Sequence, residues 1–259
     1  MSDFYITLPS NSSMQYYKHN TLSDFTTRLP NNIDLTGDWE VGLVEIQYPH
    51  NWYNVPTSKR NRSFTLRSKA VTDPEGPIGA YSFFIPEGYY SSVELLLNEI
   101  AQNGNKAMLT TGNKIRLRYN PITRKVRFSH DHECTMTVPE HIRKMIGMEW
   151  EYFTIGRMKT TQVVDMDPID SLFVYCDVAE PRVVGDSQVP LLRIVPAEGD
   201  HGELVTRVYE NVHYVRLQRK SFQTIEINIR DRTGNKVPFE QGTLNVTLHF
   251  RQRKRLSTL

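Results

Sequence analysis

The most regular alternation of hydrophobic and polar residues lies in the last third of the chain. Three isoleucines alternate with polar side chains over residues 224–230, and apolar and polar residues alternate over 244–250. Because successive side chains of a strand point to opposite faces, each run predicts a strand with one buried and one wet face. Turn-forming residues fill 231–236. We interpret the two runs as antiparallel strands, and residues 213–219 repeat the pattern upstream.

Two earlier runs depart from simple alternation. Residues 171–178 are apolar at both sets of alternate positions, which is typical of a strand buried between two layers or against another subunit. In residues 39–48 the apolar positions change phase, from Trp39, Val41 and Leu43 to Val44, Ile46 and Tyr48. That change predicts either a β-bulge or a strand covered on both sides.

Residues 114–119 and 125–128 flank turn residues at 120–124 and predict a hairpin. One face is apolar and the other carries cations. Alternating cations usually mark a solvated face, although such a cluster can also hold a polyanion. The cations of this hairpin are Lys114, Arg116, Arg118, Arg124, Lys125 and Arg127.

Two short segments follow the helical period instead. Ser91 and Glu94 predict a capping box before an apolar stripe, and Gly104 is placed to end that helix, which therefore spans 91–103. A second helix of about two turns is predicted over 139–147, beginning at a proline and stopping at a glycine.

The composition also favours strands. The chain has 6 Ala against 21 Val and 22 Thr, and β-branched residues pack well on a pleated surface. Strands at short intervals, with helices only as insertions, favour a sandwich or barrel over a doubly wound sheet. The predicted fold class is therefore all-β.

Length and charge limit the classes of function. A chain of 259 residues with a formal net charge of +2 forms one large or two small domains without a strong overall attraction to nucleic acid. Residues 1–9 lack the features of a secretory signal, and no apolar run approaches a membrane span. We expect a protein that is neither secreted nor embedded in a membrane. Cys134 and Cys176 are too few for a disulfide framework.

Catalytic motifs are weak or absent. The sequence contains no phosphate-binding glycine loop. Gly185-Asp186-Ser187 resembles a protease nucleophile segment, but Gln188 and Val189 follow where an oxyanion turn is needed. Cys176 lies inside an apolar strand, where a thiol acts as a small hydrophobe. We expect no enzyme activity and no small-molecule substrate.

Metal ligation is also a weak interpretation. On a strand, His130, His132 and Cys134 would share a face, but no fourth ligand follows at zinc spacing. The acids at 165, 167 and 170 lack the glycine turn and terminal glutamate of a calcium loop. We interpret both groups as polar turn or strand-end residues and expect no metal and no cofactor.

The N-terminal segment 1–20 is too apolar for a free lead-in, with Phe4, Tyr5 and Leu8 near its start. We expect an arm that docks either on its own domain or on a neighbour. Trp52 and Tyr53 form an aromatic corner that suits an interface as well as a core.

The C-terminal tail, 251–259, begins with a cationic group. These residues follow the last predicted strand and have no obvious packing partner, so we interpret them as a weak contact site for nucleic acid or an acidic partner. They are Arg251, Arg253, Lys254 and Arg255.

A series of motifs runs through nearly the whole chain in a characteristic order. It comprises MSDFYITLPSNSSM (1–14), NTLSDFTTRLP (20–30), GDWEVGLVEI (37–46), YPHNWYNV (48–55), IPEGYY (85–90), PEHIRKMIGM (139–148) and DRTGNKVPFEQG (231–242). Their order and spacing resemble the minor capsid, or penton, proteins of Polinton/Maverick elements and related viruses.

The resemblance implies a single jelly-roll β-sandwich over residues 21–250, with an arm before it, a tail after it and the two helices as insertions. It also implies a structural role as a homopentamer at the five-fold vertices of an icosahedral capsid, beside a double jelly-roll major capsid protein. The protein would then be found in the virion and assembled inside the host cell, in the nucleus. On this interpretation the Phe4 to Leu8 arm reaches a neighbouring subunit, and the Arg251 to Arg255 tail faces the interior or an acidic partner.

Two other functions compete with this interpretation. A carbohydrate-binding β-sandwich would use Trp52 and Tyr53 as exposed stacking platforms. A nucleic-acid-binding barrel would use the 114–127 hairpin, but aromatic residues are not interleaved with its cations as base stacking requires.

Overall fold

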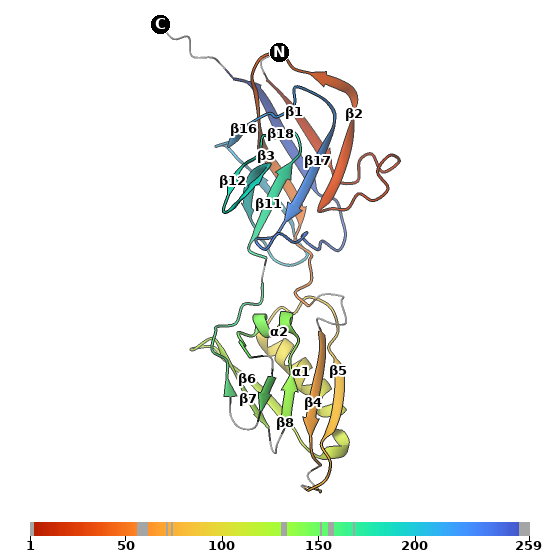
Figure 1. The fold of residues 1–259 in the computed structure, drawn as a ribbon, viewed down its shortest axis with the longest axis vertical. Coiled ribbons are helices and arrows are strands. Elements are labelled where there is room, and N and C mark those ends of the chain that lie inside the picture. Colours follow the sequence, from red (N-terminus) through yellow and green to blue (C-terminus); the bar gives the residue numbers. More distant parts are fainter. Residues whose placement is uncertain are drawn as a thin grey trace. The chain divides into compact units, whose positions relative to one another are not determined.

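The computed structural model describes residues 3–55, 62–70, 72–73, 75–130, 134–150, 152–154, 158–167 and 169–253. The chain divides into two compact units, shown in Figure 1. Unit 1 combines Met1–Trp52 with Ile169–Leu259, and unit 2 is the intervening Tyr53–Pro168. Each unit buries a hydrophobic cluster of its own. The prediction of a single domain over 21–250 is therefore corrected, because the two helices belong to unit 2, which has a hydrophobic core of its own.

One sheet of unit 1 has the strand order β1-β18-β3-β15, with β16 also paired to β3. All of its pairings are antiparallel. We call it the first sheet. Its strands are β1 (Asp3–Pro9), β18 (Asn245–Gln252), β3 (Trp39–Pro49), β15 (Leu204–Val208) and β16 (Tyr214–Arg216).

The second sheet has the order β14-β11-β17-β2, again antiparallel. A short hairpin of β12 and β13 lies between β11 and β14 in the chain. The strands are β14 (Leu191–Pro196), β11 (Ser171–Cys176), β17 (Ser221–Arg230), β2 (Asp24–Asp34), β12 (Arg182–Val184) and β13 (Ser187–Val189).

The chain passes repeatedly between these sheets. β1 and β3 belong to the first sheet and β2 to the second; β11 and β14 then lie in the second, β15 and β16 in the first, β17 in the second and β18 in the first. β15 and β16 pair with different parts of β3, so each sheet has four strand positions. Two four-stranded antiparallel sheets connected in this alternating order form a jelly roll, so the predicted fold is confirmed. The two C-terminal strands exist as predicted, but they belong to opposite sheets because each finds its partners among earlier strands.

The phase change in residues 39–48 is a β-bulge. The register between β18 and β3 shifts between Thr247, opposite Glu45, and Leu248, opposite Leu43, which leaves Val44 as the extra residue. Side chains before and after the bulge therefore both face the core, where Leu43 and Ile46 are buried. The bulge is one of the two alternatives that the sequence left open.

Unit 2 contains two small sheets together with helices. One has the order β5-β4-β8-β9 and the other β10-β7-β6. Its strands are β4 (Ser63–Ser68), β5 (Gly79–Phe84), β6 (Ile115–Asn120), β7 (Lys125–His130), β8 (Cys134–Thr137), β9 (Tyr152–Thr154) and β10 (Met158–Lys159). β6 and β7 are the predicted hairpin, paired from Ile115–His130 to Asn120–Lys125.

The helices are α1 (Val93–Ala107) and α2 (Glu140–Met145), with a 3-10 turn at Leu109–Thr111. Both were expected, but the details of α1 differ. Its N-cap is Ser92, whose Oγ accepts from the Leu95 backbone N–H at 3.1 Å, and the helix continues past Gly104. Gly104 is buried where Ile115 and Phe83 approach, so this glycine permits close packing and does not end the helix. Within the described part of the chain, no helix has the length and apolar character needed to cross a bilayer.

Candidate interaction surfaces

The N-terminal segment is a strand of the first sheet. β1 pairs with β18 over its whole length, from Asp3–Arg251 to Pro9–Asn245. Leu8 is fully buried, and the Phe4 ring stacks on Phe250 with centroids 4.9 Å apart. The expectation that this arm reaches a neighbouring subunit is therefore corrected for residues 3–9. Its apolar side chains are explained by packing on the protein's own core.

Tyr5 is the exception, because it points to the outer face of the same strand and is 62% exposed. Its ring stacks on His249 of β18 with centroids 4.3 Å apart. On the other side of His249, the Tyr214 Oη lies 2.7 Å from the imidazole Nδ1. Gly42 stands between them on β3, since His249 and Tyr214 are both its partners in register. These residues form one row across four strands.

A second row on this face consists of alternating charges. Asp3, Arg251, Glu40 and Arg216 are successive partners in register. The Arg251 Nε donates to Glu40 at 2.5 Å, and its guanidinium lies over the Tyr214 ring at 3.4 Å. Arg251 is thus part of the sheet surface and not of a tail, which corrects the expectation for this residue. Such pairing lowers its availability for an external anion.

The rest of the predicted tail is only partly described. Arg253 is exposed, and its backbone N–H donates to the carbonyl of Asp38 at 2.8 Å. Lys254 and Arg255 lie outside the described residues. The interpretation of these three cations as a contact site stays a prediction.

The two residues of the predicted aromatic corner, Trp52 and Tyr53, belong to different units. Trp52 is buried to 1% exposure in unit 1, stacked on His50 with centroids 4.1 Å apart and edge-on to Phe239 at 5.6 Å. Tyr53 is half-buried and belongs to unit 2. A buried indole cannot stack on a sugar, so the carbohydrate-binding interpretation loses one of its two proposed platforms.

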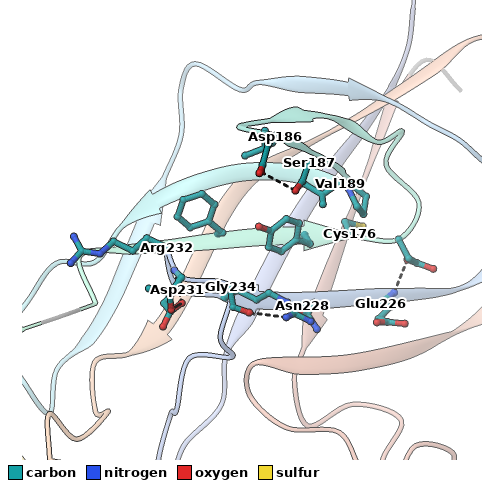
Figure 2. Close-up of a pocket in the computed structure, with 16 residues that line it drawn as sticks. Cys176, Asp186, Ser187, Val189, Glu226, Asn228, Asp231, Arg232 and Gly234 are labelled. Atoms are coloured by element: carbon teal, nitrogen blue, oxygen red, sulfur yellow. Dashed lines mark hydrogen bonds between the residues drawn. The ribbon is translucent and has the colours of Figure 1, made fainter. Parts of the chain in front are cut away.

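The outer face of the second sheet carries a hollow of about 640 Å³, shown in Figure 2. Phe173 and Tyr175 of β11 contribute its apolar floor, with Val184 and Val189 from the β12–β13 hairpin. The alternate residues of β11 face the core instead. This accounts for the run of apolar residues over 171–178, which indicated coverage on both faces without showing what covers the outer one.

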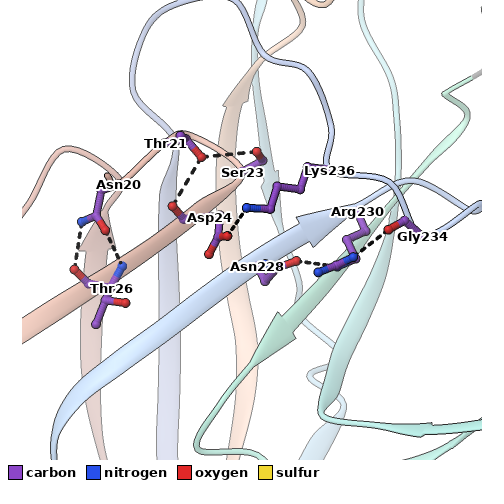
Figure 3. A network of polar contacts seen from close by, with 9 residues as sticks. All are labelled: Asn20, Thr21, Ser23, Asp24, Thr26, Asn228, Arg230, Gly234 and Lys236. Atoms are coloured by element: carbon purple, nitrogen blue, oxygen red, sulfur yellow. Dashed lines mark hydrogen bonds and ion pairs between the residues drawn. The ribbon is translucent and has the colours of Figure 1, made fainter. Parts of the chain in front are cut away.

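Polar contacts hold the loop beside this hollow (Figure 3). The Arg230 guanidinium donates to Asn228 Oδ1 and to the Gly234 carbonyl, each at 2.8 Å. Lys236 is ion-paired with Asp24 of β2. The loop 231–236 is thus tied to β17 and β2.

Cys176, Asp186 and Ser187, which were considered for catalysis, all line the hollow on the second sheet, where Ser187 Oγ donates to Asp186 Oδ1 at 3.2 Å. Burial raises the pKa of the Cys134 thiol to about 11 and that of Cys176 to about 12, which disfavours the reactive thiolate. Residues 131–133 lie outside the described part of the chain. Among the residues that are described, no group of three or more His, Cys, Asp or Glu side chains is placed to hold a metal ion.

Comparisons with known proteins agree with the fold. No family model matches the sequence, and no curated protein matches it either. The fold of the chain is shared with a protein of known structure. Specifically, it is similar to the crystal structure of the mavirus penton protein, with a TM-score of 0.55 and 10% sequence identity. The match covers 98% of this chain and 100% of that one, so it includes unit 2 as well as the sandwich.

Proposed function

We propose that the protein is a structural subunit of an icosahedral capsid, assembling as a homopentamer at the five-fold vertices beside a double jelly-roll major capsid protein. The observation that carries this proposal is the structural match to a penton protein along both chains, including unit 2. A non-catalytic role also agrees with two buried thiols whose raised pKa values keep them protonated. The protein would reside in the virion after assembly in the host nucleus.

A five-membered ring requires two different contact surfaces on each subunit, because its contacts are head-to-tail. The sandwich offers exposed apolar side chains at opposite edges. At one edge, Ile194 and Val208, which are 46% and 68% exposed, lie on the edge strands β14 and β15. Val183, 77% exposed, lies on the β12–β13 hairpin that precedes β14 in the chain. Tyr5 and Tyr16 lie at the β1 and β2 edges of the two sheets. We propose that these two edges meet between neighbouring subunits.

Native mass spectrometry of the full chain tests the assembly. We expect a particle near five times the 30.1 kDa chain mass. Val183→Asp with Val208→Asp should convert it to monomer, since a carboxylate is costly to bury at an interface. Ile122→Asp, on the unit 2 hairpin turn and 91% exposed, is the matched control and should leave the pentamer intact. A monomer that also fails to join shells when co-expressed with the major capsid protein would contradict the proposal.

A further inference from the structure

The outer face of the β10-β7-β6 sheet in unit 2 carries three cations directly beside one another. Arg118 of β6 is the register partner of Arg127 of β7, and Arg127 is in turn the partner of Lys159 of β10. All three side chains are exposed, and the alternate residues of β6 and β7 face the core. Directly opposite side chains on neighbouring strands are about 5 Å apart. We call these three residues the cation row.

Like charges in direct register destabilise a sheet, so an isolated protein gains nothing from such a row. The first sheet shows the contrasting arrangement, in which Arg251 is flanked by Asp3 and Glu40. The strands and turn that carry the cation row contain no Asp or Glu between Ile115 and His130. Within the described part of the chain, none of the three cations has an acidic partner in an ion pair. The row therefore presents uncompensated positive charge to an external anion.

The row borders a hollow of about 640 Å³. Arg118, Arg127 and Lys159 line it together with the hairpin turn, where Ile122 is almost fully exposed. A bulky anionic chain can thus come against all three cations at once, because the surface beside them is recessed. Arg side chains add a planar fork that matches the oxygens of a phosphate group.

We propose that the cation row binds the phosphate backbone of double-stranded nucleic acid without reading its sequence. Duplex DNA presents one negative charge per about 1.7 Å of axis, and cations alone are enough to hold it. Single strands are held through base stacking, but neither aromatic residue of this hairpin is free for it: Phe128 is buried in the core of unit 2, and Tyr119 packs against that core.

An acidic peptide added as an extra strand is less favoured, because part of the β6 edge is already used. The Asn105 side chain donates to the Ile115 carbonyl at 3.1 Å and accepts from its N–H at 2.7 Å. Strand addition depends on such backbone groups being free. The inference rests on the charge pattern of unit 2 and is independent of the assembly state of the chain.

Fluorescence anisotropy of the full chain with a labelled 24-base-pair duplex tests the inference. Three phosphate contacts predict a slope of about −2.7 in log affinity against log salt, or a loss of ~40-fold between 50 and 200 mM salt. The triple variant Arg118→Gln, Arg127→Gln, Lys159→Gln should lose this dependence. The single variant Lys159→Gln should reduce the slope by about 0.9.

A second triple variant with the same change in net charge is the control. Lys18→Gln, Arg67→Gln, Lys106→Gln removes three exposed cations from separate parts of the chain and should keep the wild-type slope. The cation-row triple should melt no lower than wild type at low salt, since like-charge repulsion is removed. Equal slopes for the two triples, absence of duplex binding at 50 mM salt, or tighter binding of a sulfated oligosaccharide or a polyglutamate peptide would each overturn the proposal.

Discussion

The absence of a side chain at Gly42 lets two aromatic groups meet across β3. A Cβ at this position would collide with a Val212 methyl group and would lie 2.9 Å from the His213 carbonyl oxygen. Because Gly42 has no side chain, the Tyr214 side chain can cross it and reach the His249 imidazole. Tyr5 stacks on the same imidazole from β1. An aromatic ring covering a strand glycine restores packing that the glycine alone would lose.

We expect Gly42→Ala to lower the free energy of unfolding by about 1–3 kcal/mol, because the backbone carbonyl of His213 cannot move away cheaply. Urea denaturation of the full chain measures the change. Tyr214→Phe, which keeps the ring but removes the contact with His249, should cost about 1 kcal/mol. A larger loss for Tyr214→Phe than for Gly42→Ala would show that steric space is not the main role of the glycine.

Glu226 gives a prediction about pH. Burial, followed by the nearby Asp24 and Asp177 carboxylates, raises its pKa above the ordinary value of 4.5. The folded state therefore holds a proton at pH values where the unfolded chain has released it, and the free energy of unfolding falls as pH rises through this window. Glu226→Gln should remove that fall and stabilise the protein at pH 7, by about 0–1 kcal/mol because solvent screens this exposed group.

Denaturation midpoints at pH 4, 5, 6 and 7 test the effect. The variant and wild type should converge below the unfolded-state pKa, where Glu226 is protonated in both states. Asp34 is the control of opposite sign, because hydrogen bonds from Ser221 and Asn32 lower its pKa. Asp34→Asn should therefore destabilise the protein near neutral pH, and a gain for both variants would contradict the assignment.

At the scale of elements, β1 shows why an apolar terminus can be mistaken for an interaction arm. Its inward side chains alternate with exposed ones, but the segment is short and its partner β18 lies more than 230 residues away. Sequence periodicity identifies a strand but not the strand that pairs with it. The structure supplies that partner and places Leu8 in the core.

We expect Leu8→Ala to destabilise the isolated protein by about 2–5 kcal/mol, the cost of a large-to-small change in a core. Thr7→Ala on the exposed face of the same strand should cost less than about 1 kcal/mol. Chemical denaturation of both variants measures the difference. If residues 3–9 instead left the sandwich to reach a neighbour, both substitutions would have equally small effects.

Other elements were predictable to different degrees. The hairpin turn at 120–124 and the bulge at Val44 each produce a pattern within a short stretch of sequence. The sequence therefore predicted the hairpin, and it gave the bulge as one of two alternatives. Gly104 was misread because a glycine that ends a helix and one that permits close packing look alike in sequence. The hollow over Phe173 and Tyr175 was signalled by apolar residues on both faces, but its walls come from β13 and the 231–234 loop, which contribute no local pattern.

On the scale of the whole molecule, the main feature missed from sequence is the separate core of unit 2. Its segment has no composition change or linker at either end, and strands and helices alone do not reveal which core they join. The cation row was visible in part, since the hairpin cations could be read from the sequence. Their alignment with Lys159 required the pairing of β10 with β7.

Residues 53–168 should fold when expressed alone. The two ends of the segment are held together, because Asn54 Nδ2 donates to the Met166 carbonyl at 3.1 Å, and the segment buries its own hydrophobic cluster. We expect a cooperative thermal transition by circular dichroism and dispersed amide resonances. A variant with Phe64→Ala should lose about 3–5 kcal/mol of stability in this fragment. A fragment without a cooperative transition would show that unit 2 depends on the sandwich.

The pairing of β1 with β18 also fixes when the sandwich can be completed during synthesis. β1 cannot pair until β18 has been synthesised. All the partners of β3 likewise follow unit 2 in the chain. Until β18 has left the ribosome, the edges of β1 and β3 remain open to pairing with other nascent chains. Unit 2, whose contacts are closer in sequence, can be complete well before then. The order of translation thus separates the folding of the two units in time.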